Sequence, residues 1–236
     1  MKITETDEAL ICFSEKSDGD FSLYNFDTDK IISLWNSLSI VKERRLPLPV
    51  YLNQVHKDGI IVSEEHNDFL CKNGDAIITK TPMHTIGVFS ADCLPLLIAG
   101  KNCAAAVHAG WRGSKLNIAG KTVKKLVSEY GASVKDLRVF VGPCINECCL
   151  EMGNEVFEEF LAADRLYARF FIKKENKWHL NLRKLNRYQL CEAGVIDSSI
   201  LDLDYCTYCE EDNFYSFRRQ KKRNGSMFSF IVLKNC

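Results

Sequence analysis

Short apolar runs bounded by turn residues recur along the chain and predict β-strands. They are rich in Val, Ile and Phe, as strands are. The predicted strands are Leu10–Phe13, Val50–Leu52, Ile60–Val62, Ala76–Thr79, Thr85–Phe89, Leu94–Ala99, Cys103–Val107, Leu137–Val141 and Phe228–Leu233. Because proline cannot donate a hydrogen bond to a neighbouring strand, Pro95 predicts that its strand is short or lies at a sheet edge.

Helical spacing of apolar residues interrupts the strands in fewer places. The clearest helix follows Ser114, a predicted N-cap, and stops at Gly131. Further helices are predicted around Val156–Leu161 and Leu182–Cys191, and a weaker pattern covers Asp29–Leu38. Since the strands cluster in the first half of the chain, we expect a single α+β domain over residues 1–236 with a mixed or antiparallel sheet core.

Composition and charge narrow the function classes. Of 236 residues, 46% are hydrophobic and 26% are charged, which is typical of a globular protein. Lys plus Arg and Asp plus Glu number 31 each, and this balance argues against a nucleic-acid-binding protein. No run approaches the ~18 consecutive apolar residues of a membrane span. The first residues lack the pattern of a signal peptide, so we expect a cytoplasmic protein, of undetermined oligomeric state.

A basic cluster precedes the last predicted strand. Its members are Arg218, Arg219, Lys221, Lys222 and Arg223. A solvated turn explains such a cluster more simply than a phosphate-binding patch, and it is the interpretation we favour.

Cysteine is the unusual residue of this composition, with 11 in a chain without an export signal. An odd number in this setting argues against a disulfide framework and leaves metal ligation, catalysis or packing. One group comprises Cys144, Cys148 and Cys149, and another is the CxxC of Cys206 and Cys209. Neither spacing is typical of a four-cysteine zinc site, and the acidic residues after the CxxC do not favour a redox motif. We interpret both groups as structural.

Cys93 and His108 form the first candidate site. A hairpin turning at Gly100-Lys101 would make them cross-strand partners with Cβ atoms ~5 Å apart. The histidine could activate the thiol as a nucleophile, or both could bind a metal such as zinc, with His56 as third ligand. The simpler alternative is a buried cysteine beside a hydrogen-bonded core histidine.

The residues around this pair suggest a binding site. Gly113 and the helix predicted to follow it would present backbone N–H groups to an anion. Trp111 offers a flat apolar face to a base or sugar, and Arg112 offers a bidentate grip on phosphate. Asp92 adjoins Cys93 and is a candidate proton shuttle, or a residue that orients a ligand.

Five segments carry a family resemblance: NQVH, GDAIITK, SADCLPLL, AAVHAGWRG and GPCINECCLEMG, in this order between about Asn53 and about Phe160. They closely resemble the polyphenol oxidase-like, laccase-domain family, also called peptidoglycan editing factors, whose members are regarded as purine nucleoside phosphorylases. The resemblance implies an α+β sandwich of sheets flanked by helices. It also implies one zinc ion on His56, Cys93 and His108, with copper as the alternative ion.

The resemblance further implies phosphorolysis of adenosine, inosine, guanosine and methylthioadenosine, together with adenosine deamination. A small nucleoside and phosphate would therefore be the partners. Motifs of true multicopper oxidases are not visible. Two segments depart from the family pattern: Leu23–Phe26 with Trp35–Ser37 near the start, and Gly225-Ser226 where relatives carry Gly-Arg. These departures bear on substrate choice more than on metal binding.

Two other functions use the same residues. Cys93 as nucleophile and His108 as base could cleave an amide of a cell-wall precursor without a metal. Alternatively, the protein could bind a nucleoside without turning it over.

Overall fold

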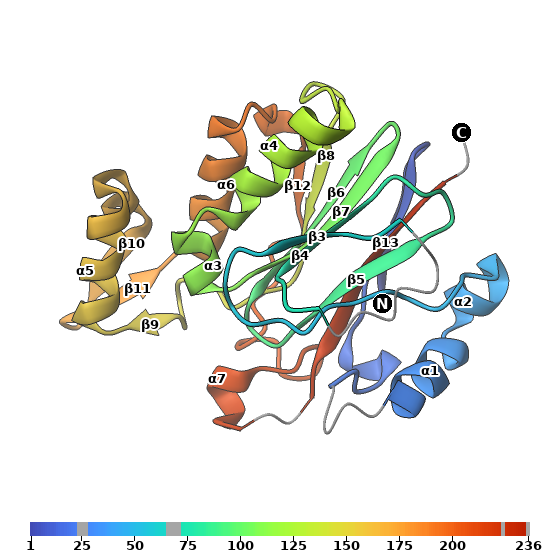
Figure 1. The fold of residues 1–236 in the computed structure, drawn as a ribbon. Helices are drawn as coiled ribbons and strands as arrows, with labels where there is room; N and C mark the ends of the chain where they lie inside the picture. The colour runs from blue at the N-terminus through green and yellow to red at the C-terminus, as the bar shows by residue number, and fades with distance from the viewer. Residues whose placement is uncertain (23–27, 65–71, 223–224, 235–236) are drawn as a thin grey trace.

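Two β-sheets face each other and carry helices on their outer sides (Figure 1). The structure is a computed structural model that describes residues 1–22, 28–64, 72–222 and 225–234. The expected α+β sandwich is confirmed, and the protein is a single-domain α+β fold. The segment Leu23–Phe26, which departs from the family pattern, lies outside the described residues.

The larger sheet has six strands and mixed direction. Its order is β12 (Ile200–Asp202), β8 (Arg138–Val141), β6 (Leu94–Gly100), β7 (Cys103–Ala109), β4 (Ala76–Thr79) and β3 (Ile60–Val62). The inner pairs are antiparallel, whereas β12 and β3 each run parallel to their neighbour. The central strands are buried along their whole length, which explains their continuous apolar sequences.

The smaller sheet has four antiparallel strands in the order β1 (Lys2–Glu5), β2 (Ala9–Phe13), β13 (Met227–Leu233) and β5 (Thr85–Ser90). Its inner face packs on the larger sheet in one apolar cluster that includes Ile11, Val88 and Ile231 from the smaller sheet, and Leu97 and Ala106 from the larger. This cluster joins the two sheets into one core.

Helices cover both outer faces. On the larger sheet lie α4 (Ile118–Tyr130) and α6 (Leu182–Glu192), and on the smaller lie α1 (Thr28–Ser37) and α2 (Ser39–Arg44). A side unit at the left of Figure 1 combines β9 (Glu151–Met152), α5 (Asn154–Ala163), β10 (Phe171–Lys174) and β11 (Lys177–Leu180). Two short helices, α3 (Trp111–Lys115) and α7 (Phe217–Gln220), lie near one end of the sheets. No described helix is long and apolar enough to cross a membrane.

Three local predictions are wrong. Val50–Leu52 forms no strand, because only Val50 makes an isolated bridge, to Ile86. Ser114 caps no helix: it lies inside α3, and Asn117 caps α4 by accepting a hydrogen bond from Gly120 N. Pro95 does not mark an edge, because β6 is central. Proline is tolerated there because pairing with β8 begins only at Leu96.

The candidate functional residues lie at the same end of both sheets. Strands β4, β6 and β13 begin there, and strands β5, β7 and β8 end there, as the strand registers require. Loops at this end carry polar side chains that the apolar strands could not accommodate.

Candidate metal centre and substrate cavity

His56, Cys93 and His108 converge at this end of the sandwich, with their ligand atoms within 4.8 Å of one another. His108 lies on β7, Cys93 directly before β6, and His56 in the loop between α2 and β3. The two imidazole rings meet edge to face, with centroids 4.8 Å apart. The structure thus brings the predicted ligand set together.

The hairpin that joins β6 and β7 has a different register from the predicted one. The turn lies at Lys101-Asn102, so His108 pairs with Pro95, and continuing the register places Cys93 opposite Gly110. The difference is two residues, which keeps Cys93 and His108 on one face as diagonal neighbours. A Cβ on Gly110 would lie 2.9 Å from Cys93 Sγ, so only glycine leaves room for the thiol.

Asp75, directly before β4, organises the centre. Its Oδ1 accepts hydrogen bonds from His108 Nδ1 at 2.8 Å and from His56 N at 2.9 Å, and its Oδ2 accepts one from Lys57 N at 2.8 Å. Burial would raise the pKa of Asp75, but these hydrogen bonds hold it below the ordinary value. Because His108 Nδ1 faces this carboxylate, His108 Nε2 is left for the cavity.

Backbone geometry also directs His56 into the centre. His56 has a left-handed conformation with φ 57°, which is uncommon outside glycine. Asp75 holds its N–H, and Gln54 anchors the same loop to β5 through Phe89, donating to its carbonyl at 2.8 Å and accepting from its N–H at 2.7 Å. The sequence pattern did not reveal Asp75, although it lies in the GDAIITK segment.

Cys93 and His108 perturb each other electrostatically. Burial opposes ionisation of the thiol, but the charge of His108 and hydrogen bonds from both histidines lower the pKa of Cys93 to about 6. Burial likewise disfavours the imidazolium, but Cys93 and Asp75 raise the pKa of His108 to about 9. A thiolate is the form of cysteine that binds metals and acts as a nucleophile.

Asp92 lies beside Cys93 and faces the cavity with a buried carboxylate. Its backbone φ of 94° is unusual for a residue with a side chain. Thr207 donates its hydroxyl to Oδ1 at 2.7 Å, and Arg218 donates its backbone N–H to Oδ2 at 2.6 Å. Both carboxylate oxygens are therefore engaged in holding segments together.

The predicted substrate-binding residues separate into two kinds. Trp111 and Arg112 line the cavity, with the guanidinium of Arg112 stacked 4.1 Å from the Trp111 ring centroid. Gly113 does not line it: a Cβ there would lie 2.9 Å from the Lys57 carbonyl, so glycine allows α3 to pack on the His56 loop.

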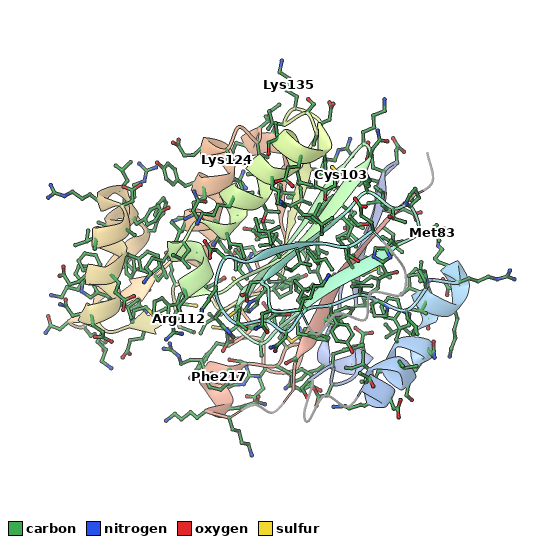
Figure 2. The ribbon with its side chains drawn as sticks, in the orientation of Figure 1. Met83, Cys103, Arg112, Lys124, Lys135 and Phe217 are labelled. Atoms are coloured by element: carbon green, nitrogen blue, oxygen red, sulfur yellow. The ribbon has the colours of Figure 1, made fainter. Side chains whose placement is uncertain are left out.

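The centre opens into a cavity of about 680 Å³. Sequence reasoning missed most of its walls, which include Tyr51, Phe89 and Phe217. Arg218 and Lys222 also line it. Lys222 is exposed, as a solvated turn predicts, whereas Arg218 is half-buried and donates to the Glu151 carbonyl at 2.9 Å, and Arg223 lies outside the described residues. Figure 2 shows Arg112 on α3 and Phe217 on α7 at the same end of the molecule.

A second side-chain group lies outside this cavity. Cys148, Cys149, Cys206 and Cys209, which the sequence places in two separate groups, have sulfur atoms within 4.8 Å of one another. Of the histidines that the structure describes, His84 contacts Ser63, and His179 contacts the carbonyl of Glu147. Neither joins the metal-ligand groups found among the described residues.

Comparison with known proteins gives consistent matches. A family model described as multi-copper polyphenol oxidoreductase laccase matches residues 25–234. A purine nucleoside phosphorylase of Clostridium acetobutylicum is 37% identical over 187 residues, covering 78% of this chain and 76% of the relative. Adenosine deaminase RL5 of an unknown prokaryotic organism is 34% identical, covering 68% and 62%. The crystal structure of Bacillus licheniformis YfiH superimposes with a TM-score of 0.87 at 26% identity, covering 96% and 93%.

Proposed function

The chain belongs to the multi-copper polyphenol oxidoreductase laccase family, and on that basis we propose that it is a zinc-dependent purine nucleoside phosphorylase. Its substrates would be phosphate and adenosine, inosine, guanosine or methylthioadenosine, with adenosine deamination as a second activity. The observation that carries this proposal is the convergence of His56, Cys93 and His108 in a cavity with aromatic walls and a basic rim.

The donor set suits a metal ion. Two imidazoles and a thiolate form a three-ligand set of the kind that leaves zinc one open position, and copper accepts the same donors. The lowered pKa of Cys93 favours the thiolate that a metal needs. When bound, zinc would act as a Lewis acid on the reacting group.

The cavity offers different surfaces to the two substrates, the nucleoside and phosphate. Aromatic side chains of Tyr51, Phe89 and Trp111 provide apolar faces against which a purine can stack. Arg112, Arg218 and Lys222 provide positive charge for phosphate. Phosphate held on this rim would attack the anomeric carbon of the ribose as the C–N bond to the base breaks, and the base would leave with a proton. In deamination, water would instead attack the ring carbon that bears the amino group, and the C–N bond to that group would break to release ammonia.

Phosphate-dependent release of the base tests this function. Wild-type protein should bind zinc at the His56 centre and release base from inosine or adenosine only when phosphate is present. Cys93→Ala should lose that zinc and about 10³-fold of the turnover, because it removes a ligand whose metal contributes several kcal/mol. Metal analysis and base release measure both effects.

Cys191→Ala is the matched control, because Cys191 lies on α6 outside the cavity and should leave turnover unchanged. Full turnover by metal-free wild-type protein would contradict the proposal, as would a Cys93→Ala variant with wild-type activity.

The arginine that sequence analysis assigns to phosphate gives a sharper prediction. Arg112→Met should raise the KM for phosphate about 10- to 100-fold, since a hydrogen bond to a charged group is worth about 1.5–3 kcal/mol. The KM for the nucleoside should change little. Arg138→Met is the control, because Arg138 is exposed and pairs with Ala99 away from the cavity. An unchanged phosphate KM would exclude Arg112 from the phosphate site.

For Asp92 we favour a positioning role over a proton shuttle, because both of its oxygens already accept hydrogen bonds. Asp92→Asn should lower kcat by about 10-fold, through misplacement of the neighbouring Cys93, without removing a limb of the pH–rate profile. A proton shuttle would instead lose about 10²–10⁴-fold together with that limb. The pH–rate profiles of both proteins distinguish the two roles.

One observation supports a second function. Cys93, His108 and Asp75 form a chain of contacts like the nucleophile, base and orienting acid of a cysteine hydrolase. Against this, His56 also contacts the thiol, which such a hydrolase does not require. Amide cleavage that persists in excess chelator and is stopped by alkylation of Cys93 would favour the hydrolase.

A further inference from the structure

Four cysteine thiols gather outside the substrate cavity, although they come from segments far apart in the sequence. Cys148 and Cys149 lie in the turn before β9, and Cys206 and Cys209 lie in the loop after β12. The Sγ–Sγ distances are 3.8 Å for Cys148–Cys206, 3.7 Å for Cys148–Cys209, 3.5 Å for Cys148–Cys149 and 3.4 Å for Cys149–Cys209. All four sulfur atoms lie within 4.8 Å of one another.

These distances match the edges of a small tetrahedron. Zinc–thiolate bonds of about 2.3 Å place sulfur ligands about 3.8 Å apart at the corners of a regular tetrahedron. A disulfide would require a separation near 2.05 Å within one pair. The similar distances between several pairs therefore fit one shared ion better than two covalent bonds.

Backbone hydrogen bonds join the turn before β9 to the loop after β12, and one further bond reaches a thiol of the cluster. Cys144 and Cys206 form a parallel bridge, in which Cys144 N donates to the Tyr205 carbonyl and Thr207 N donates to the Cys144 carbonyl. Asn146 N lies 3.4 Å from Cys206 Sγ and donates to it. Hydrogen bonds from backbone amides to sulfur stabilise a thiolate, the form that binds zinc.

We propose that Cys148, Cys149, Cys206 and Cys209 bind a second zinc ion in a structural site, separate from His56, Cys93 and His108. Four thiolates leave no open position for water or substrate, which is the arrangement of structural zinc sites. The carboxylate of Glu210, which accepts a hydrogen bond from Cys206 N, places further negative charge beside the cluster and favours a cation.

The proposed site would clamp one wall of the substrate cavity. In the segment that leads to Cys148 and Cys149, Ile145 N donates to the backbone carbonyl of Asp92 at 2.9 Å. In the segment that carries Cys206 and Cys209, the Thr207 hydroxyl donates to Asp92 Oδ1 at 2.7 Å. An ion that joins these segments would therefore fix Asp92, and through it the neighbouring Cys93, without touching the substrate.

Zinc counting on the reduced protein tests the proposal. Wild-type protein should hold two zinc ions per chain, the Cys148→Ser/Cys209→Ser variant one, and Cys93→Ala one. Both serines replace exposed cysteines, so the variant should fold. Cys191→Ser, a part-buried cysteine outside the cluster, should retain both ions. This test does not depend on the proposed enzymatic activity. Cys93→Ala removes only the ion of the cavity, so any zinc that this variant retains reports the cysteine cluster.

Two further measurements apply even if the double variant fails to fold. Zinc should protect the four cluster thiols of wild-type protein and of Cys93→Ala from iodoacetamide. Cobalt bound by Cys93→Ala should show intense thiolate-to-metal charge-transfer absorption. Equal zinc content in wild-type protein and a folded double variant would overturn the proposal. So would alkylation of the cluster at the same rate with and without zinc.

Discussion

Asp75→Asn is expected to weaken zinc binding at the His56, Cys93 and His108 centre by about 10- to 100-fold and to lower turnover with it. An asparagine presents one oxygen and one N–H₂ group where Asp75 presents two accepting oxygens. Either His108 Nδ1 or the backbone N–H of Lys57 therefore loses its acceptor. Competition of the protein with a calibrated chelator measures zinc affinity, and base release measures turnover.

The companion variant Asp75→Ala should also lower the free energy of unfolding, by about 3–5 kcal/mol, because it leaves buried donors without their charged partner. Denaturant titration measures this loss. Asp212→Asn, at an exposed turn residue, is the control and should change neither zinc affinity nor stability. Wild-type zinc affinity in Asp75→Asn would show that the His108 ring needs no support from this carboxylate.

Gly110→Ala should strongly lower turnover while leaving the fold intact. The new Cβ would lie 2.9 Å from Cys93 Sγ and 3.4 Å from His56 Cδ2, so the thiol must move. Gly110 has φ −68° and ψ 170°, a conformation that alanine adopts without strain. We expect turnover to fall about 100-fold or more, the cost of misplacing a reacting group by about 1 Å. The unfolding midpoint should change little.

Gly131→Ala is the control, and we expect it to lower stability without changing turnover. Gly131 ends α4 at φ 67° with no neighbouring atom near its would-be Cβ. Alanine there should lower stability by about 1 kcal/mol, through strain in the left-handed region, and leave turnover unchanged. If Gly110→Ala retained zinc and activity, the close approach of its backbone to Cys93 would not matter to the centre.

That Cys93 and His108 lie close together could be predicted from sequence, because His108 lies on β7 and Cys93 directly precedes the neighbouring strand β6. The apolar runs around Cys93 and His108 define a hairpin, and the register error of two residues preserved the face that both side chains share. An error of one residue would have placed them on opposite faces. The third ligand, His56, came from the family resemblance and from the strand predicted before it, although that strand does not form.

Other parts of the site depend on contacts that local patterns do not encode. Asp75 precedes a buried strand, where an isolated carboxylate carries no periodic signal, and its importance follows only from the donors that surround it. Arg218 and Phe217 reach the cavity from the far end of the chain. The cysteine cluster likewise combines the adjacent Cys148 and Cys149 with the CxxC of Cys206 and Cys209. Sequence spacing alone does not predict that these two groups meet.

The position of β13 has a consequence for the order in which the protein can fold. This strand follows every other strand in sequence, yet it lies between β2 and β5 in the smaller sheet. The segment before it supplies Arg218, whose backbone N–H fixes Asp92, and Phe217 of the cavity wall. During synthesis, the earlier strands can therefore collapse while a gap remains in the smaller sheet. The cavity wall is complete only when β13 has entered that gap, so the cavity should form late in folding.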